Sequence, residues 1–136
     1  MMKGSRDLKF LLKNMEPIHV IGEYVFTTIS RETLEKLVTP PLLIYREDKA
    51  ITVIIEKTVA EIHKLDFESV WGLISLSIHS DLAAVGFLAA VTNALAEAGI
   101  STNVVSAFYH DHLFVPIERV SDAISLLREL SKSTAG

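Results

Sequence analysis

The chain passes twice through the same order of strand-type and helix-type hydrophobic periodicity, and this repetition limits the folds it can adopt. In the second half, residues 70–78 (VWGLISLSI) alternate between two faces as a strand does. A helix is predicted from Ser80, a favourable N-cap, to just before Gly99, a residue type that commonly ends helices. The remaining predicted elements are strands in STNVVSAFY and LFVPI and an amphipathic helix over residues 118–132. The order is strand, helix, strand, strand, helix.

The first half repeats this order with shorter elements. The predicted elements are a strand at residues 24–30, a helix at 31–37, two strands in PPLLIYRE and AITVIIEK, and a helix at 58–65. The segment DLKFLLKNM in front adds a strand or a helix, and its pattern does not decide between the two. We therefore predict two related subdomains, residues 1–65 and residues 66–136.

The repeated order predicts an α+β fold with two ferredoxin-like subdomains. In such a unit, helices cover one face of a mainly antiparallel sheet. Each half lacks one strand of a four-stranded unit, and either the N-terminal segment or the other half supplies it.

Composition excludes several classes of partner. The chain is 49% hydrophobic and 22% charged, which suits a folded core. Residues 66–136 hold three Lys or Arg and eight Asp or Glu, and no basic stripe runs along the chain, so nucleic acid is not an expected partner. No apolar run reaches the roughly 18 residues that span a bilayer. We expect a cytoplasmic protein with no membrane partner.

The predicted long helix lacks charge. Between Asp81 and Glu97 there is no charged residue, whereas a surface helix normally shows a polar face. We expect this helix to be covered by its own sheet and also by the other subdomain or a second chain, and we predict a homodimer.

The sequence His110-Asp111-His112 raises the question of a metal site. The two histidines would face the same way on a strand, but no recognisable spacing supplies further ligands. We favour a hairpin turn at Asp111 with the histidines beside it at the solvent edge, and we predict no cofactor and no bound metal. A metal enzyme at His110 and His112 is kept as a third hypothesis.

Other motifs of catalysis are missing from the sequence. There is no cysteine, no GxSxG elbow, no P-loop, no GxGxxG and no carboxylate pair in a recognisable arrangement. We do not expect an enzyme.

The most favourable binding site is the junction SIHSDLAAVGF, residues 77–87. The free backbone N–H groups of a helix start can receive an anion such as a carboxylate. Gly86 would let a ligand approach closely, although packing of the helix explains it equally well. The next strand begins with Ser101, Thr102 and Asn103, which we expect to face the junction; an ordinary polar loop is the alternative.

Residues 75–116, SLSIHSDLAAVGFLAAVTNALAEAGISTNVVSAFYHDHLFVP, resemble the ACT-domain proteins, which sense small molecules in amino-acid metabolism. The shared features are a strand followed by S-x-L-x-x-V-G-F, the helix end A-L-A-x-x-G-I-S, and the hairpin S-x-x-x-x-D-x-x-x-V. The whole chain is similar to small bacterial proteins with two tandem ACT-like units, related to those of aspartate kinases and of the arginine-sensing CASTOR proteins. The first half resembles a degenerate unit.

The resemblance implies a ligand site at the loop after the first strand and at the helix start, often at an interface between two units. An acidic residue on the hairpin helps to hold the charged end of the ligand in the arginine sensors, and Asp111 lies where that residue is expected. The implied ligand-binding residues are His79, Ser80, Asp81, Leu82, Val85 and Gly86, with Ser101, Thr102 and Asn103 opposite, and Asp111.

The function implied is a non-enzymatic, regulatory protein that binds a small molecule, an amino acid in the leading hypothesis. The alternative is a protein–protein interaction module in which the charge-free helix binds a partner and the ligand site is vestigial.

Overall fold

The computed structural model describes residues 3–134, which form two compact units. The large unit comprises the described residues up to Ile21 and from Gly72 onward, and the small unit comprises residues 22–71. The two units are defined by which residues contact one another, and the large unit combines two separate segments of the chain. The predicted boundary between residues 65 and 66 divides the sequence into two continuous halves, and it stays a prediction.

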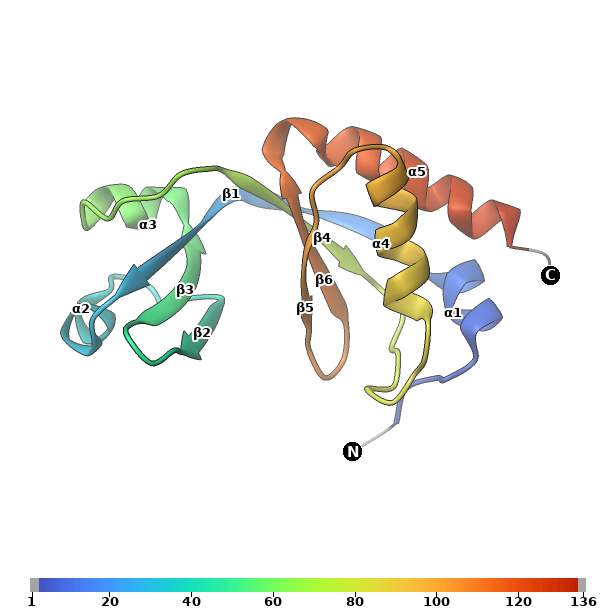
Figure 1. Ribbon diagram of the computed structural model, residues 1–136, viewed down its shortest axis with the longest axis horizontal. Helices are drawn as coiled ribbons and strands as arrows, with labels where there is room; N and C mark the ends of the chain where they lie inside the picture. The colour runs from blue at the N-terminus through green and yellow to red at the C-terminus, as the bar shows by residue number, and fades with distance from the viewer. Residues whose placement is uncertain (1–2, 135–136) are drawn as a thin grey trace. The chain divides into compact units, whose positions relative to one another are not determined.

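Figure 1 labels the elements of both units. The large unit holds α1 (Leu8–Asn14), the first part of β1 (Pro17–Ile29), β4 (Trp71–Leu76), α4 (Phe87–Glu97), β5 (Asn103–Ser106), β6 (Asp111–Pro116), the 3-10 helix η1 (Ile117–Arg119) and α5 (Val120–Ser133). The small unit holds the rest of β1, α2 (Arg31–Lys36), β2 (Leu43–Arg46), β3 (Ile51–Glu56) and α3 (Lys57–Ile62). The predicted ferredoxin-like α+β class is confirmed.

β1 supplies the strand that the sequence pattern left missing from the second half. Its residues up to Ile21 belong to the large unit, where the strand order is β1-β4-β6-β5. Its later residues belong to the small unit, where the order is β2-β3-β1 and β1 pairs antiparallel with β3 from Tyr24↔Glu56 to Ile29↔Ile51. The strand that completes the four-stranded unit is therefore the first part of β1, residues 17–21, which follows the segment DLKFLLKNM.

The segment DLKFLLKNM forms helix α1. Asp7 is its N-cap, because the carboxylate accepts a hydrogen bond from the Phe10 amide at 3.1 Å. Leu11, Leu12 and Met15 are buried on one side of this segment. The burial of this apolar side explains why the segment is a helix and not a strand, a choice that the local sequence pattern left open.

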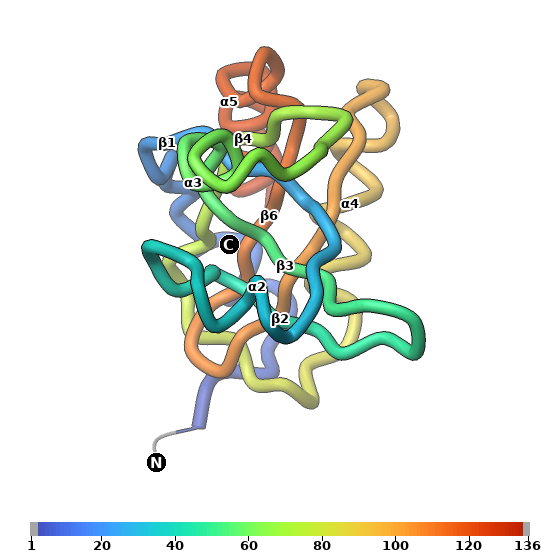
Figure 2. The backbone as a smooth tube through the Cα atoms, turned by 90° about the vertical axis from the view of Figure 1, so that its left-hand side faces the viewer, coloured from blue at the N-terminus to red at the C-terminus, as the bar shows by residue number. Residues whose placement is uncertain are grey.

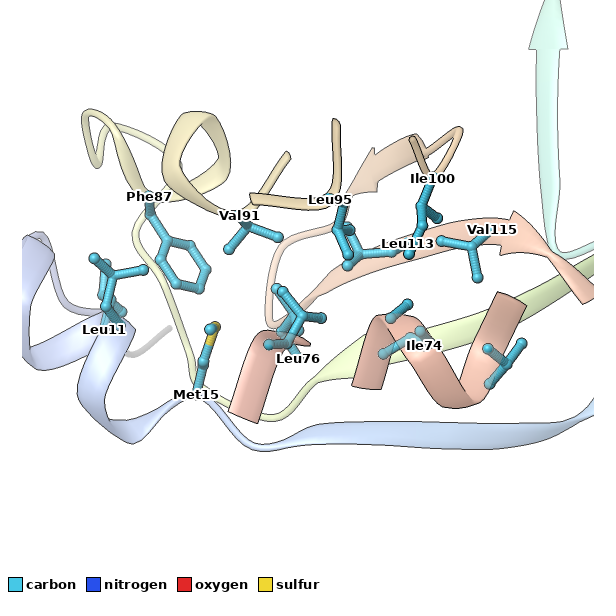
Figure 3. Packing of buried hydrophobic residues seen from close by; sticks show 14 residues of the cluster. Leu11, Met15, Ile74, Leu76, Phe87, Val91, Leu95, Ile100, Leu113 and Val115 are labelled. Carbon is cyan, nitrogen blue, oxygen red and sulfur yellow. The ribbon is translucent and has the colours of Figure 1, made fainter. Parts of the chain in front are cut away.

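The core of the large unit lies between its sheet and the helices on one face (Figure 3). The labelled core residues are Leu11 and Met15 from the α1 segment, Ile74 and Leu76 from β4, Phe87, Val91 and Leu95 from α4, Ile100 after it, and Leu113 and Val115 from β6. Each fully buried large aliphatic side chain contributes about 1.5–3 kcal/mol. The small unit has its own, smaller core around Val25, Val53 and Ile55.

Helix α4 begins later than the sequence predicted. The predicted start was Ser80, but Gly86 is the N-cap, with a φ of 91°, and the helix runs from Phe87. The reason is a tight turn at Asp81, whose Oδ1 accepts from the Ala83 amide at 2.8 Å and whose carbonyl accepts from the Ala84 amide at 2.9 Å. Such local bonds compete with helix formation. The residues from Ser80 to Gly86 therefore form a loop.

Residues 3–134 contain no helix with both the length and the apolar character that crossing a membrane requires.

Candidate functional site

A cleft of about 130 Å³ lies at the N-terminal end of α4. Three parts of the large unit surround it: the loop after β4, the first turn of α4, and the ends of β5 and β6 that the hairpin turn joins. The lining residues are Ser80, Asp81, Leu82, Ala84, Gly86, Phe87, Leu88, Ala89, Ser106 and Asp111.

The first turn of α4 presents unsatisfied donors to this cleft. The first amide bonded within the helix is that of Ala90, which donates to the Gly86 carbonyl at 3.0 Å. No side chain caps the helix, and no described residue accepts a hydrogen bond from the amides of Phe87, Leu88 or Ala89. Together with the positive end of the helix dipole, three free amides favour an anionic group at this position.

A buried carboxylate lies across the cleft. Asp111 is only 4% exposed, and its Oδ2 accepts a hydrogen bond from the Ser80 hydroxyl at 2.7 Å. Ser106 is its partner in the β5–β6 register and brings a second hydroxyl to the cleft. A carboxylate with hydroxyl neighbours is suited to receive an ammonium group.

The prediction that Asp111 marks the hairpin turn is wrong. Asp111 is the first residue of β6, and the turn comes before it, where the Ala107 amide donates to the His110 carbonyl at 3.1 Å. The tip holds Phe108 and Tyr109, whose rings lie 4.9 Å apart. Ring contacts with His79, 5.3 Å from Tyr109, hold the tip and leave Asp111 inside the strand pair. The sequence reasoning had placed the turn at the charged residue because such residues are common in turns.

The N-terminal residues Gly4–Arg6, which we call the strap, run beside the loop after β4 (Figures 1 and 2). The Ser5 amide donates to the His79 carbonyl at 2.9 Å, and the Asp81 amide donates to the Ser5 carbonyl at 2.8 Å. A Cβ on Gly4 would lie 2.6 Å from the backbone of His79 and Ser80, so only glycine allows this approach. The strap therefore fixes the loop that forms one wall of the cleft.

Asp81 is held by both the turn and the strap. The Ala83 amide and, to a smaller extent, the Arg6 guanidinium lower the pKa of the Asp81 carboxyl below its ordinary value, against an opposing effect of burial. The Arg6 Nε lies 3.2 Å from the Asp81 Oδ1. The charge of Asp81 is thus balanced within the protein.

The structure brings together only part of the predicted set of binding residues. Ser80, Asp81, Leu82, Gly86 and Asp111 line the cleft. His79 does not, because its ring lies against Phe108 and Tyr109, and Val85 is 85% exposed outside the lining.

Ser101, Thr102 and Asn103 are not brought to the cleft. They follow the C-terminal end of α4, and the Thr102 hydroxyl donates to the Ile100 carbonyl at 3.2 Å. Because α4 returns the chain along the sheet, the end of β5 rather than its start reaches the cleft, and Ser106 takes the expected place. The sequence signal for Ser106 was its spacing of five residues before Asp111 in the hairpin motif.

The small unit has a cleft of about 490 Å³ at the corresponding place in its fold, between the end of β1, the start of α2 and the β2–β3 hairpin. Here Ser30 follows β1 directly, and its hydroxyl accepts from the Thr33 amide at 3.1 Å. The start of this helix is therefore capped by the protein itself. Of the two helices that begin at these corresponding clefts, α2 is capped by a side chain and α4 is not.

The two histidines of the hairpin have different surroundings from those predicted. His112 is partly buried, and its Nδ1 lies 2.7 Å from the Ser75 hydroxyl. Burial, and then the neighbouring His110, lower the pKa of His112 below its ordinary value, while Asp111 acts in the opposite direction. Within residues 3–134, no group of three or more His, Cys, Asp or Glu side chains is arranged to hold a metal ion.

Comparison with known proteins gives matches over most of the chain. Two family models, both described as ACT domain, match residues 3–72 and residues 68–129. Among proteins with curated functions, none matches.

Several solved structures are similar. A crystal structure of a Vibrio cholerae protein, described as of unknown function and a possible transport protein, is 36% identical, with a TM-score of 0.81 over 91% of this chain and 95% of that one. A protein from Agrobacterium tumefaciens is 19% identical, with a TM-score of 0.66 over 87% and 90% of the two chains. The regulatory subunit of aspartate kinase from Thermus flavus is 10% identical, with a TM-score of 0.64 over 85% and 96%, a likeness of fold.

Proposed function

The chain belongs to the ACT-domain family, with an ACT domain matched in each half, and from this premise we propose that it is a non-enzymatic regulatory protein that binds an amino acid. ACT domains are regulatory ligand-binding modules, and the cleft at the start of α4 is the site that we assign to the ligand. The bound and empty states of this site would then regulate a partner.

The chemistry of the cleft supports an α-amino acid. The carboxylate of the ligand meets the free amides of Phe87, Leu88 and Ala89. Its ammonium group meets Asp111, and the hydroxyl of Ser106 lines the same cleft. The observation that carries the proposal is that one cleft contains both an uncapped helix start and a buried carboxylate. The zwitterion of an amino acid needs the first for its carboxylate and the second for its ammonium group.

A thermal-shift screen of the twenty amino acids tests this function. A ligand at 100 times its Kd stabilises the folded protein by about 2.7 kcal/mol. Asp111→Asn removes the charge but keeps an acceptor for Ser80, and we expect it to abolish the shift. Asp66→Asn removes the same charge from an exposed residue that lines neither cleft, and it serves as the control. A screen in which no amino acid raises the melting temperature would contradict the proposal.

A protein–protein interaction module is the second candidate function, and the outer face of α4 is the observation that favours it. Ala89, Asn93 and Ala96 are exposed on this helix, which carries no charge before its last residue, Glu97, and we expect a second copy of the chain to cover it. Ala96→Lys places a cation at the C-terminal end of the helix, where the dipole tolerates it. If the face is a dimer interface, this variant is a monomer by sedimentation equilibrium. A wild-type protein that is already a monomer excludes the homodimer.

A further inference from the structure

We propose that the cleft selects a small, neutral amino acid, between alanine and valine in size, and rejects the acidic and basic amino acids. This inference rests on the proposed function and deepens it, because it assigns a ligand class to the same site. Three properties of the cleft carry it: its acids, its lack of cations, and its size.

The cleft has one carboxylate for one cationic group. Two acids line it, Asp81 and Asp111. The Oδ1 of Asp81 already binds the Ala83 amide and faces the Arg6 guanidinium, so its charge is balanced. Asp111 accepts a hydrogen bond from the neutral hydroxyl of Ser80 and forms no ion pair with a described residue, so it can accept from the ammonium group of the ligand. A lysine or arginine ligand carries a second cation, for which no further unbalanced carboxylate lines the cleft.

The cleft has no partner for a second anionic group. No Lys, Arg or His is among its lining residues. The three free amides at the start of α4 lie together within one helical turn and suit a single carboxylate. The side-chain carboxylate of aspartate or glutamate would be placed beside Asp111 or against apolar groups, and an unpaired charge in such surroundings is costly.

The remaining lining is apolar and leaves little room. Leu82, Ala84 and Leu88 contribute apolar surface around a volume of about 130 Å³. A cavity of about 150 Å³ in another protein holds benzene. Alanine has as many non-hydrogen atoms as benzene, and valine differs from alanine by two further methyl groups on its Cβ. Amino acids of this size fill the cleft, whereas phenylalanine and tryptophan must extend out of it.

Isothermal titration with alanine, valine, phenylalanine, lysine, arginine and aspartate tests the proposal directly. We expect alanine or valine to bind at least tenfold more tightly than each of the charged amino acids and than phenylalanine. Tighter binding of lysine, arginine, aspartate or phenylalanine overturns the selectivity while the sensing function stands. Absence of binding by all six, together with the absence of a shift for any amino acid in the thermal screen, overturns both.

A cleft variant provides a second readout. Leu88→Ala enlarges the apolar side of the cleft, and we expect the ratio of the phenylalanine Kd to the alanine Kd to fall at least fivefold. Leu126→Ala removes the same side-chain atoms from α5, where Leu126 packs against the core and does not line the cleft. Circular dichroism melting establishes that both variants fold. An unchanged ratio in a folded Leu88→Ala protein contradicts the size argument.

Discussion

Replacement of Gly4 by alanine is the sharpest structural perturbation available, because Gly4 controls how the strap meets the ligand loop. The new Cβ would lie 2.6 Å from the His79 carbonyl oxygen and the Ser80 carbonyl carbon, and 2.7 Å from the Asp81 nitrogen. These are backbone atoms, which cannot rotate away as a side chain can. The strap must therefore separate from the loop.

The cost of separation follows from the contacts that are lost. The two backbone hydrogen bonds of Ser5 contribute about 0.5–1.5 kcal/mol each. The Arg6–Asp81 ion pair adds little, because solvent screens the Arg6 side chain, which is 63% exposed. Alanine restricts the unfolded chain and returns about 0.4–1 kcal/mol. We expect the free energy of unfolding to fall by about 1–3 kcal/mol.

Urea unfolding and amide hydrogen exchange measure this effect. Exchange of the Asp81 amide should accelerate in Gly4→Ala, because that amide loses its acceptor on Ser5. Gly99→Ala is the matched control: its Cβ meets nothing within 4 Å, but its φ of 73° is unfavourable for alanine by about 1–2 kcal/mol. It should lower stability and leave exchange at Asp81 unchanged relative to its neighbours. A Gly4→Ala protein with full stability and full protection at Asp81 would refute the reasoning.

Three further predictions concern the site and its surroundings. Ser80→Ala removes the hydroxyl that donates to the buried Asp111, and we expect urea unfolding to show a loss of about 1.5–3 kcal/mol in the free energy of unfolding. Ser131→Ala is the control: it removes a hydroxyl that donates to the Lys13 carbonyl at the surface, and it should cost less than half as much. The pKa of His112 is lowered in the folded state, so the unfolded state binds the proton first as the pH falls. The contribution of neutral His112 to stability is therefore fully present above about pH 6.5 and is lost as the pH falls through the folded-state pKa. His112→Gln should flatten that part of the stability–pH profile, and an unchanged slope would contradict it. Arg6→Ala should raise the pKa of the Asp81 carboxyl in an NMR titration, although by less than loss of the Ala83 amide contact would, and an unchanged value would exclude the ion pair in solution.

The order of elements could be predicted because hydrophobic periodicity and burial are local properties of each segment. α2 begins at Arg31, as predicted, with Ser30 as its N-cap, and β3 covers residues inside AITVIIEK. Helix α1 could not be separated from a strand, because what decides it is the burial of Leu11 and Met15 against elements that lie far along the chain.

The site was predicted less completely than the fold, for a reason visible at two serines. Ser30 and Ser80 both follow a strand and precede a helix-forming sequence, yet only Ser30 caps a helix. At Ser80, the strap takes the neighbouring amide and Asp111 takes the hydroxyl, and both partners are remote in sequence. The contribution of Ser106 likewise depends on which end of β5 reaches the cleft, a consequence of how α4 returns the chain.

The most direct measurement of the central claim is an amide NMR titration with the amino acid that gives the largest thermal shift. The account predicts that the N–H resonances of Phe87, Leu88 and Ala89 move together and saturate, because the ligand carboxylate accepts from them, and that Asp111→Asn abolishes the change. Saturable binding that leaves these three resonances in place, or no binding by any amino acid, would contradict it.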